Sequence, residues 1–195
     1  PAPEGVDKKL IGAYLDESLE RLRICVNSVK WWTRNCFDPL HSSQYCTLLY
    51  YLSNSIWRVC GDQSRVPTKL FLLNKALNAI DLFYEIEMPS KFFIGHSSGI
   101  VLAKASYSDY LVLYQGCTVG KNHGIAPRLE ERVLLYPGSK VIGDSVVRAG
   151  SIVAAGVNII NQETKGDSLV FQSNAGSLKF KDFRRNGLKD IFYLD

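Results

Sequence analysis

Residues 135–160, LYPGSKVIGDSVVRAGSIVAAGVNII, decide the fold because an aliphatic side chain recurs at every sixth position. An amphipathic helix repeats every 3.6 residues and a half-buried strand every two, so a period of six fits neither element. Such a period is typical of a solenoid in which each hexapeptide forms one side of a coil. The recurring positions, called anchors below, are Leu135, Val141, Val147, Val153 and Ile159.

The same spacing continues towards the N-terminus with Val101, Tyr107, Leu113 and Val119. The interval from Val119 to Leu135 is 16 residues, which is not a multiple of six. We therefore expect residues 120–132 to leave the solenoid as a loop, and inserted loops commonly carry function.

Small residues stand four positions after most anchors, for example Ser139, Ser145 and Ser151. Glycine or aspartate stands three positions after the later anchors, and these residues tolerate tight turns. Short antiparallel strands would instead place turns every 8–12 residues. The pattern therefore predicts a left-handed parallel β-helix over residues 89–178.

Before residue 88 the apolar spacing is helical, as in Leu70, Leu73 and Leu77. This spacing predicts three helices, over residues 7–33, 40–60 and 67–86. The expected organisation is a helical N-terminal domain over 1–88, the β-helix over 89–178 and a C-terminal tail over 179–195. The fold class is thus α+β.

The composition excludes several classes of protein. The 195 residues carry a formal charge of +4 without the long Lys/Arg run of a nucleic-acid groove. We expect no membrane span, because apolar runs are too short. The five cysteines include no CxxC pair, so we expect no metal site. Reduced thiols suit a cytoplasmic protein.

Four segments resemble the serine acetyltransferase family of hexapeptide-repeat acyltransferases. The match extends over about residues 70–165. The resemblance implies transfer of an acetyl group from acetyl-CoA, no metal, and a homotrimer with CoA in a groove between adjacent prisms. The matching segments are HSSGIVL at 96–102, QGCTVG at 115–120, PRLE at 127–130 and GSKVIG at 138–143.

The resemblance also implies catalytic residues. His96 matches the family's general base, and an imidazole suits that role near neutral pH. Glu87 aligns with the acid that orients the base if one coil is deleted before His96, with Asp81 and Glu85 as alternatives. His123, in the loop, would enter the site from a neighbouring subunit. His41, beside the turn at Asp38 and Pro39, is expected at the surface or as a helix cap.

Two departures from the family concern the acceptor. Gly95 stands where the family has an acid that contacts its amino-acid substrate, and Ile125–Pro127 replaces an Arg-His-Pro segment. We therefore favour a sugar or related small hydroxyl acceptor, attacking the thioester directly. The alternatives are serine O-acetylation in cysteine biosynthesis, amino-sugar N-acetylation, and a scaffold without activity.

The donor would lie against backbone groups of the coil turns, where small residues permit close approach. Lys140 and Arg148 could meet its phosphates. Val112, Tyr114, Leu134 and Tyr136 flank the anchors and point outward, which suggests contact between subunits. The donor-binding candidates are Gly116, Gly138, Ser139, Ala154 and Ala155, with Lys140.

Overall fold

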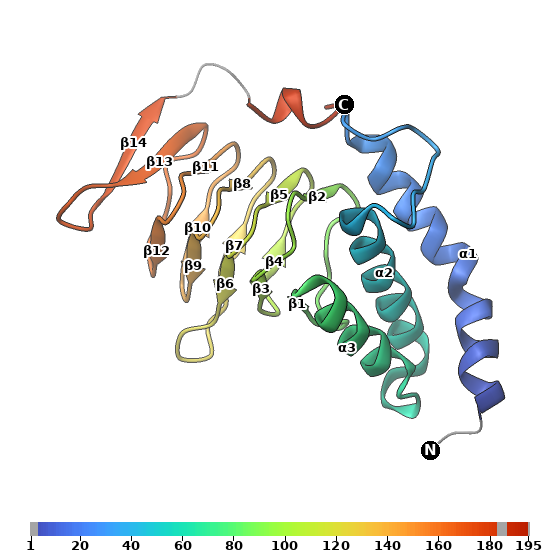
Figure 1. Ribbon diagram of the computed structural model, residues 1–195. Coiled ribbons are helices and arrows are strands. Elements are labelled where there is room, and N and C mark those ends of the chain that lie inside the picture. The colour runs from blue at the N-terminus through green and yellow to red at the C-terminus, as the bar shows by residue number, and fades with distance from the viewer. Residues whose placement is uncertain (1–3, 183–186, 195) are drawn as a thin grey trace.

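In the computed structural model, residues 4–182 and 187–194 are described, and they form three helices followed by a parallel β-solenoid of about five turns (Figure 1). The predicted α+β class and the parallel β-helix are confirmed. The helices are α1 (Glu4–Ser28), α2 (Ser42–Cys60) and α3 (Val66–Asn78), with a 3₁₀ turn η1 at Gly61–Gln63.

Helix α3 ends eight residues before the predicted limit of 86. Ala79 takes a left-handed conformation with φ 51° and donates its N–H to the Lys75 carbonyl, which closes the last turn. Strand β1 begins at Asp81, so the solenoid starts before residue 88. The apolar Ile80 and Tyr84 continued the helical spacing in sequence and concealed this boundary.

The solenoid has three sheets of parallel strands. The β1 sheet has the order β1-β3-β6-β9-β12, the β4 sheet β4-β7-β10, and the β2 sheet β2-β5-β8-β11-β13, to which β14 is added. The remaining bounds are β2 Phe92–Ile94, β3 Val101–Leu102, β4 Ser106–Tyr107, β5 Leu111–Leu113, β6 Thr118–Gly120, β7 Arg128–Leu129, β8 Leu134–Leu135, β9 Lys140–Ile142, β10 Val146–Val147, β11 Ile152–Val153, β12 Asn158–Ile160, β13 Ser168–Gln172 and β14 Leu178–Asp182.

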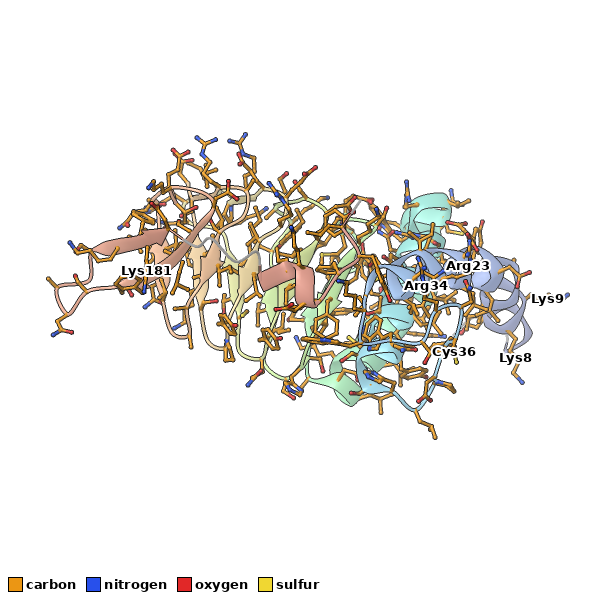
Figure 2. All side chains as sticks on the ribbon, turned by 90° about the horizontal axis from the view of Figure 1, so that it is seen from above. Lys8, Lys9, Arg23, Arg34, Cys36 and Lys181 are labelled. Carbon is orange, nitrogen blue, oxygen red and sulfur yellow. The ribbon has the colours of Figure 1, made fainter. Side chains whose placement is uncertain are left out.

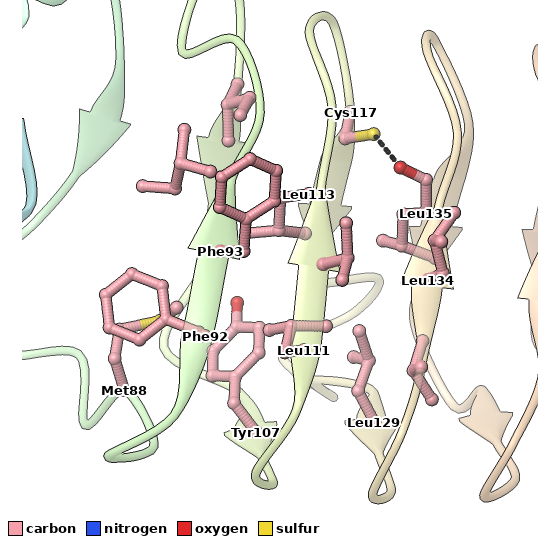
Figure 3. Packing of buried hydrophobic residues seen from close by; sticks show 14 of the residues in the cluster. Met88, Phe92, Phe93, Tyr107, Leu111, Leu113, Cys117, Leu129, Leu134 and Leu135 are labelled. Atoms are coloured by element: carbon pink, nitrogen blue, oxygen red, sulfur yellow. Dashed lines mark hydrogen bonds between the residues drawn. The ribbon is translucent and has the colours of Figure 1, made fainter. Parts of the chain in front are cut away.

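The anchors from Tyr107 onward are buried and stack in register inside the prism (Figure 3). Val101 is the exception, because its side chain is 44% exposed and Leu102 occupies the inner position instead. Leu102 and Tyr107 are five positions apart rather than six, so this side of the prism is one residue shorter.

The first coil uses Leu82, Met88 and Ile94, which are also spaced by six and are all buried. Leu82 pairs with Leu102, and Ile94 pairs with Leu113. A complete coil therefore precedes His96.

The inserted loop is shorter than the predicted 120–132. Leu129 is an anchor, paired with Tyr107 on one side and Val147 on the other. The insertion is a hairpin in which Asn122 and Ile125 exchange backbone hydrogen bonds of 3.0 Å. Its two-residue turn, at His123 and Gly124, has positive φ angles of 47° and 81°.

The predicted tail is largely part of the packed structure. Strand β14 pairs with β13, and η2 (Gly187–Asp190) then crosses the outside of the β2 sheet towards α1 (Figures 1 and 2). Phe192 is fully buried and forms an antiparallel bridge with Val29. Residues 183–186 and 195 of this segment lie outside the described residues.

The C-terminal segment 187–194 changes the interpretation of two residues that face outward from the prism. Val112 on β5 and Leu134 on β8 are buried within the single chain, in one hydrophobic cluster with Leu188 of η2. They were expected at a subunit interface, but the chain covers them itself. Tyr114 and Tyr136 instead stack on each other, with ring centroids 5.6 Å apart and planes within 6°.

Candidate active site

His96 follows β2 at the turn that leads from the β2 sheet to the β1 sheet. Its side chain is exposed and lines a pocket of about 400 Å³ between the helical region and the first coils. The pocket is open on one side, so a small acceptor can reach the imidazole. The other lining residues are Trp31, Trp32, His41, Ser42, Ser43, Phe93, Gly95 and Tyr114.

One wall of the pocket is aromatic. Phe93, on β2, meets Trp31 and Trp32 edge-on, with centroid distances of 5.4 and 5.3 Å. His41 meets Trp32 in the same way at 5.6 Å. Such edge-to-face pairs are favourable beyond simple burial. They join the segment between α1 and α2 to the strand that precedes His96.

The position of the Tyr114 side chain requires a glycine at position 95. A Cβ at this position would lie 2.5 Å from Cε1 of Tyr114, and 3.4 Å from Cε1 of Phe93. The Tyr114 ring therefore fills the space that any side chain at position 95 would need. Burial, and then the nearby Tyr136, raises the pKa of the Tyr114 hydroxyl, which stays neutral at physiological pH.

A column of glycines runs along the same edge of the prism, which we call the glycine corner. It comprises the turns between the β2 sheet and the β1 sheet, and His96 lies at its start. Gly99, Gly116, Gly138 and Gly156 occupy equivalent turn positions with φ between 70° and 75°. A Cβ at Gly116 would lie 3.5 Å from the Gly138 nitrogen, so successive backbones approach closely.

The predicted donor-binding residues separate into two groups at this corner. Gly116 and Gly138 belong to the column, and Ala154 and Ala155 lie in the turn before Gly156. Lys140 is exposed on the adjoining strand. Ser139 differs, because it is fully buried and its Oγ lies 3.5 Å from the Cys117 sulfur inside the corner.

The predicted acids are engaged elsewhere. Glu87 lies 4.0 Å from the Arg58 Nε, and Asp81 accepts a 2.6 Å hydrogen bond from Lys75. Glu85 pairs with Lys104 at 3.0 Å. Among the described residues, none of these carboxylates forms a hydrogen bond or ion pair with His96.

Arg148 is also engaged. It follows β10 and pairs with Glu130, which follows β7, and with Glu163, so the ion pairs join successive coils beside the β4 sheet. Its guanidinium is therefore held on a different side of the prism from the glycine corner, and it is a structural cation of the solenoid.

His123 lies on another edge of the prism. Its hairpin connects β6 of the β1 sheet to β7 of the β4 sheet and projects away from the coil (Figure 1). The imidazole is exposed. One chain therefore does not bring His123 and His96 together.

Sequence reasoning missed two features of the pocket. His41 is exposed, as expected, and nothing in the sequence indicates that it also lines the pocket of His96. The Tyr114 ring covers Gly95, a contact that the spacing of the anchors does not predict. No spacing in the sequence joins residue 41 to residue 96, because the contact depends on how the helical region packs against the first coil.

No protein-family model matches the chain. A serine acetyltransferase of Bacillus licheniformis is 26% identical over 149 residues, covering 68% of this chain and 68% of the relative. A crystal structure of a Brucella abortus serine acetyltransferase superposes with a TM-score of 0.70 at 18% identity, covering 89% of this chain and 72% of that one. The chain is similar in sequence and fold to serine acetyltransferases of the hexapeptide-repeat type.

This serine acetyltransferase-like chain spans about two thirds of the length of its curated relatives. A further solved structure, a Neisseria gonorrhoeae serine acetyltransferase in complex with serine, has a TM-score of 0.68 at 11% identity and covers 86% of this chain and 71% of that one. The likeness in sequence indicates an acyltransferase. Within residues 4–182 and 187–194, no helix is long and apolar enough to cross a membrane.

Proposed function

We propose that the chain is an acetyl-CoA-dependent O-acetyltransferase whose acceptor is L-serine or a close analogue. The observation that carries the proposal is the position of His96, which lines the acceptor-sized pocket and stands at the start of the glycine corner. A base beside an open strip of backbone is the arrangement that transfer between two bound substrates requires.

In this proposal His96 is the general base. Its neutral imidazole takes the proton from the acceptor hydroxyl as the oxygen attacks the thioester carbonyl. The carbon–sulfur bond then breaks, CoA leaves as the thiol, and His96 returns its proton to the departing sulfur. Cys117 takes no part, because its thiol is fully buried and burial raises its pKa.

The donor site is proposed along the glycine corner. Backbone groups at Gly116 and Gly138, with those of Ala154 and Ala155, would hold the pantetheine arm, while Lys140 would meet a phosphate. The glycines at equivalent positions of successive turns support the fit, because a residue without a Cβ permits close approach of a ligand to the backbone. Ser139 would contribute only its backbone, since its side chain points inward.

A homotrimer is part of the proposal, because the glycine corner is an open edge and a neighbouring prism would convert it into a groove. The His123 hairpin projects from the prism (Figure 1). We propose that this hairpin borders the site from the adjacent subunit.

Two observations support serine as the acceptor. The curated relatives are serine acetyltransferases, so the comparisons favour serine over the sugar that the sequence alone suggested. Ser42 and Ser43 begin α2 inside the pocket, and this helix has no acidic residue in its first turn. A helix N-terminus attracts anions, including the carboxylate of an amino acid.

A neutral sugar hydroxyl is the second candidate. The residues that line the pocket include no Asp, Glu, Lys or Arg, and four of them are aromatic. Aromatic rings beside neutral polar groups suit a sugar as well as an amino acid. Position 95 also lacks the acid that would hold a substrate ammonium group.

The test is a thiol-release assay with acetyl-CoA, comparing L-serine with methyl α-D-glucopyranoside. Mass spectrometry of the product identifies the acetylated atom. Faster turnover of L-serine to O-acetylserine supports the proposal, whereas faster acetylation of the glucoside supports the second candidate. No turnover of either above the rate of acetyl-CoA hydrolysis contradicts both.

A further inference from the structure

We propose that His41 is an acceptor-binding residue, whose imidazole hydrogen-bonds a polar group of the acceptor in the His96 pocket. The inference rests on the proposed function, and it adds a residue from the helical region to a site otherwise built by the solenoid. Neither the hexapeptide pattern nor the matching segments include this residue.

The first step concerns the functional groups that line the pocket. Nine residues line it, and His41, His96 and Tyr114 are the only ones with titratable side chains. Ser43 is buried, and its Oγ is directed to the Gly95 carbonyl at 3.4 Å. With His96 assigned to the proton of the reacting hydroxyl, His41 is the exposed imidazole left to bind the rest of a polar acceptor.

The backbone of His41 is fixed, which is the second step. Its N–H donates to the Asp38 carbonyl at 3.1 Å, and its carbonyl accepts from the Tyr45 N–H at 2.9 Å in the first turn of α2. The residue stands at the N-cap position, yet its side chain makes no capping hydrogen bond. Among the described residues, no hydrogen bond occupies the two ring nitrogens.

The ring itself is also positioned, which is the third step. His41 packs edge-on against Trp32, with an interplanar angle of 79°. Trp32 is 8% exposed and packs in turn against Phe93, three positions before His96. His41 is thus held on an aromatic wall that continues to β2, so ordering its side chain for binding costs little entropy.

An imidazole suits either candidate acceptor. Its nitrogens can donate to a carboxylate or exchange hydrogen bonds with a hydroxyl. Because this contact forms with the bound acceptor before and during the transfer, it contributes mainly to acceptor affinity. His41 therefore controls the KM for the acceptor, while His96 controls kcat.

The test compares His41→Phe and His41→Asn with wild-type protein in the thiol-release assay. Phenylalanine keeps a ring against Trp32 but has no hydrogen-bonding atoms, and asparagine keeps a donor and an acceptor. Loss of one such hydrogen bond corresponds to about a tenfold change in affinity. The matched control is Leu40→Ala, because Leu40 is 93% exposed and does not line the pocket.

We expect His41→Phe to raise the KM for the acceptor about tenfold or more, with the KM for acetyl-CoA and kcat within about twofold of wild type. His41→Asn should recover part of the loss, and Leu40→Ala should match wild type. An unchanged acceptor KM in His41→Phe overturns the inference while the proposed function stands.

A direct binding measurement separates the remaining outcomes. L-serine and methyl α-D-glucopyranoside are titrated calorimetrically into wild-type protein and His41→Phe. If wild type shows no turnover but binds one probe, and His41→Phe weakens that binding about tenfold, the inference stands and the proposed function fails. If wild type binds neither probe, both fail.

Discussion

The solenoid and the helical region contribute to the pocket in different ways. In the solenoid, each inner side chain meets the equivalent residue of the coils above and below, as Val141 meets Val119 and Ile159. The helical region has no such repeat, and its contacts with the solenoid are individual ones, such as Trp32 on Phe93. The repeat places His96 and the glycine corner, whereas the individual contacts place the wall opposite them.

This difference explains which parts of the site can be predicted from the sequence. A residue within the repeat is located by counting, and a residue outside it is located only by packing. Substitutions should follow the same division. In the solenoid they change stability through the backbone turns and the volume of the inner side chains, and in the helical region through a few aromatic contacts. The predictions below test that division, from the largest expected effect to the smallest.

The largest expected effect on stability comes from substitution in the C-terminal segment 187–194, which packs back against the helical region. Phe192 is fully buried, packs edge-on against Tyr110 at 5.4 Å and bridges to Val29. Phe192→Ala should lower the free energy of unfolding by about 3–5 kcal/mol, as measured by urea denaturation. Phe171→Ala, at a residue 38% exposed on β13, should cost less than about 1 kcal/mol. Equal losses of unfolding free energy in the two variants would show that the C-terminal segment 187–194 does not join the solenoid to the helical region.

The pairing of Gly95 with Tyr114 gives the next effect. Gly95→Ala should cost about 1–3 kcal/mol, because the new methyl group overlaps the tyrosine ring. The double variant with Tyr114→Ala should be less destabilised than the sum of the two single variants. Strict additivity in this double-mutant cycle would contradict the packing described at position 95.

Substituting one glycine in the solenoid and one in the helical region should change the free energy of unfolding by smaller amounts and in opposite directions. Gly138 has a φ of 71° in the solenoid, and Gly138→Ala should destabilise by about 1–2 kcal/mol. Gly12 lies within α1, where a Cβ meets no atom within 4 Å, and Gly12→Ala should stabilise by about 0.5–1 kcal/mol. Thermal unfolding of both variants checks the signs, and a common sign would refute the assignment of either backbone conformation.

Much of the solenoid was predictable because the spacing of six recurs in almost every coil. The spacing failed where the coil length changes by one residue, which displaced the anchor from Val101 to Leu102. It also failed where two periods overlap, since Tyr84 extends the helical stripe into a coil whose anchors are Leu82 and Met88. Local spacing cannot decide between two elements that share the same apolar residues.

The site was predictable only in its solenoid part. His96, Gly116 and Gly138 lie along one corner because the repeat fixes their register. The ion pair between Glu87 and Arg58, and the place of His41 beside Trp32, depend on how α1 and α2 meet the first coil. The sequence contains these residues but no period that brings them together.

The central claim is that His96 is the base of an acetyl transfer, and the most direct measurement is kcat/KM for the acceptor in His96→Ala. The account predicts a loss of about 10²–10⁴-fold in the thiol-release assay, with a circular-dichroism spectrum and unfolding midpoint like those of wild type, because His96 is exposed. A folded His96→Ala protein that retains kcat/KM within about threefold of wild type would contradict the claim.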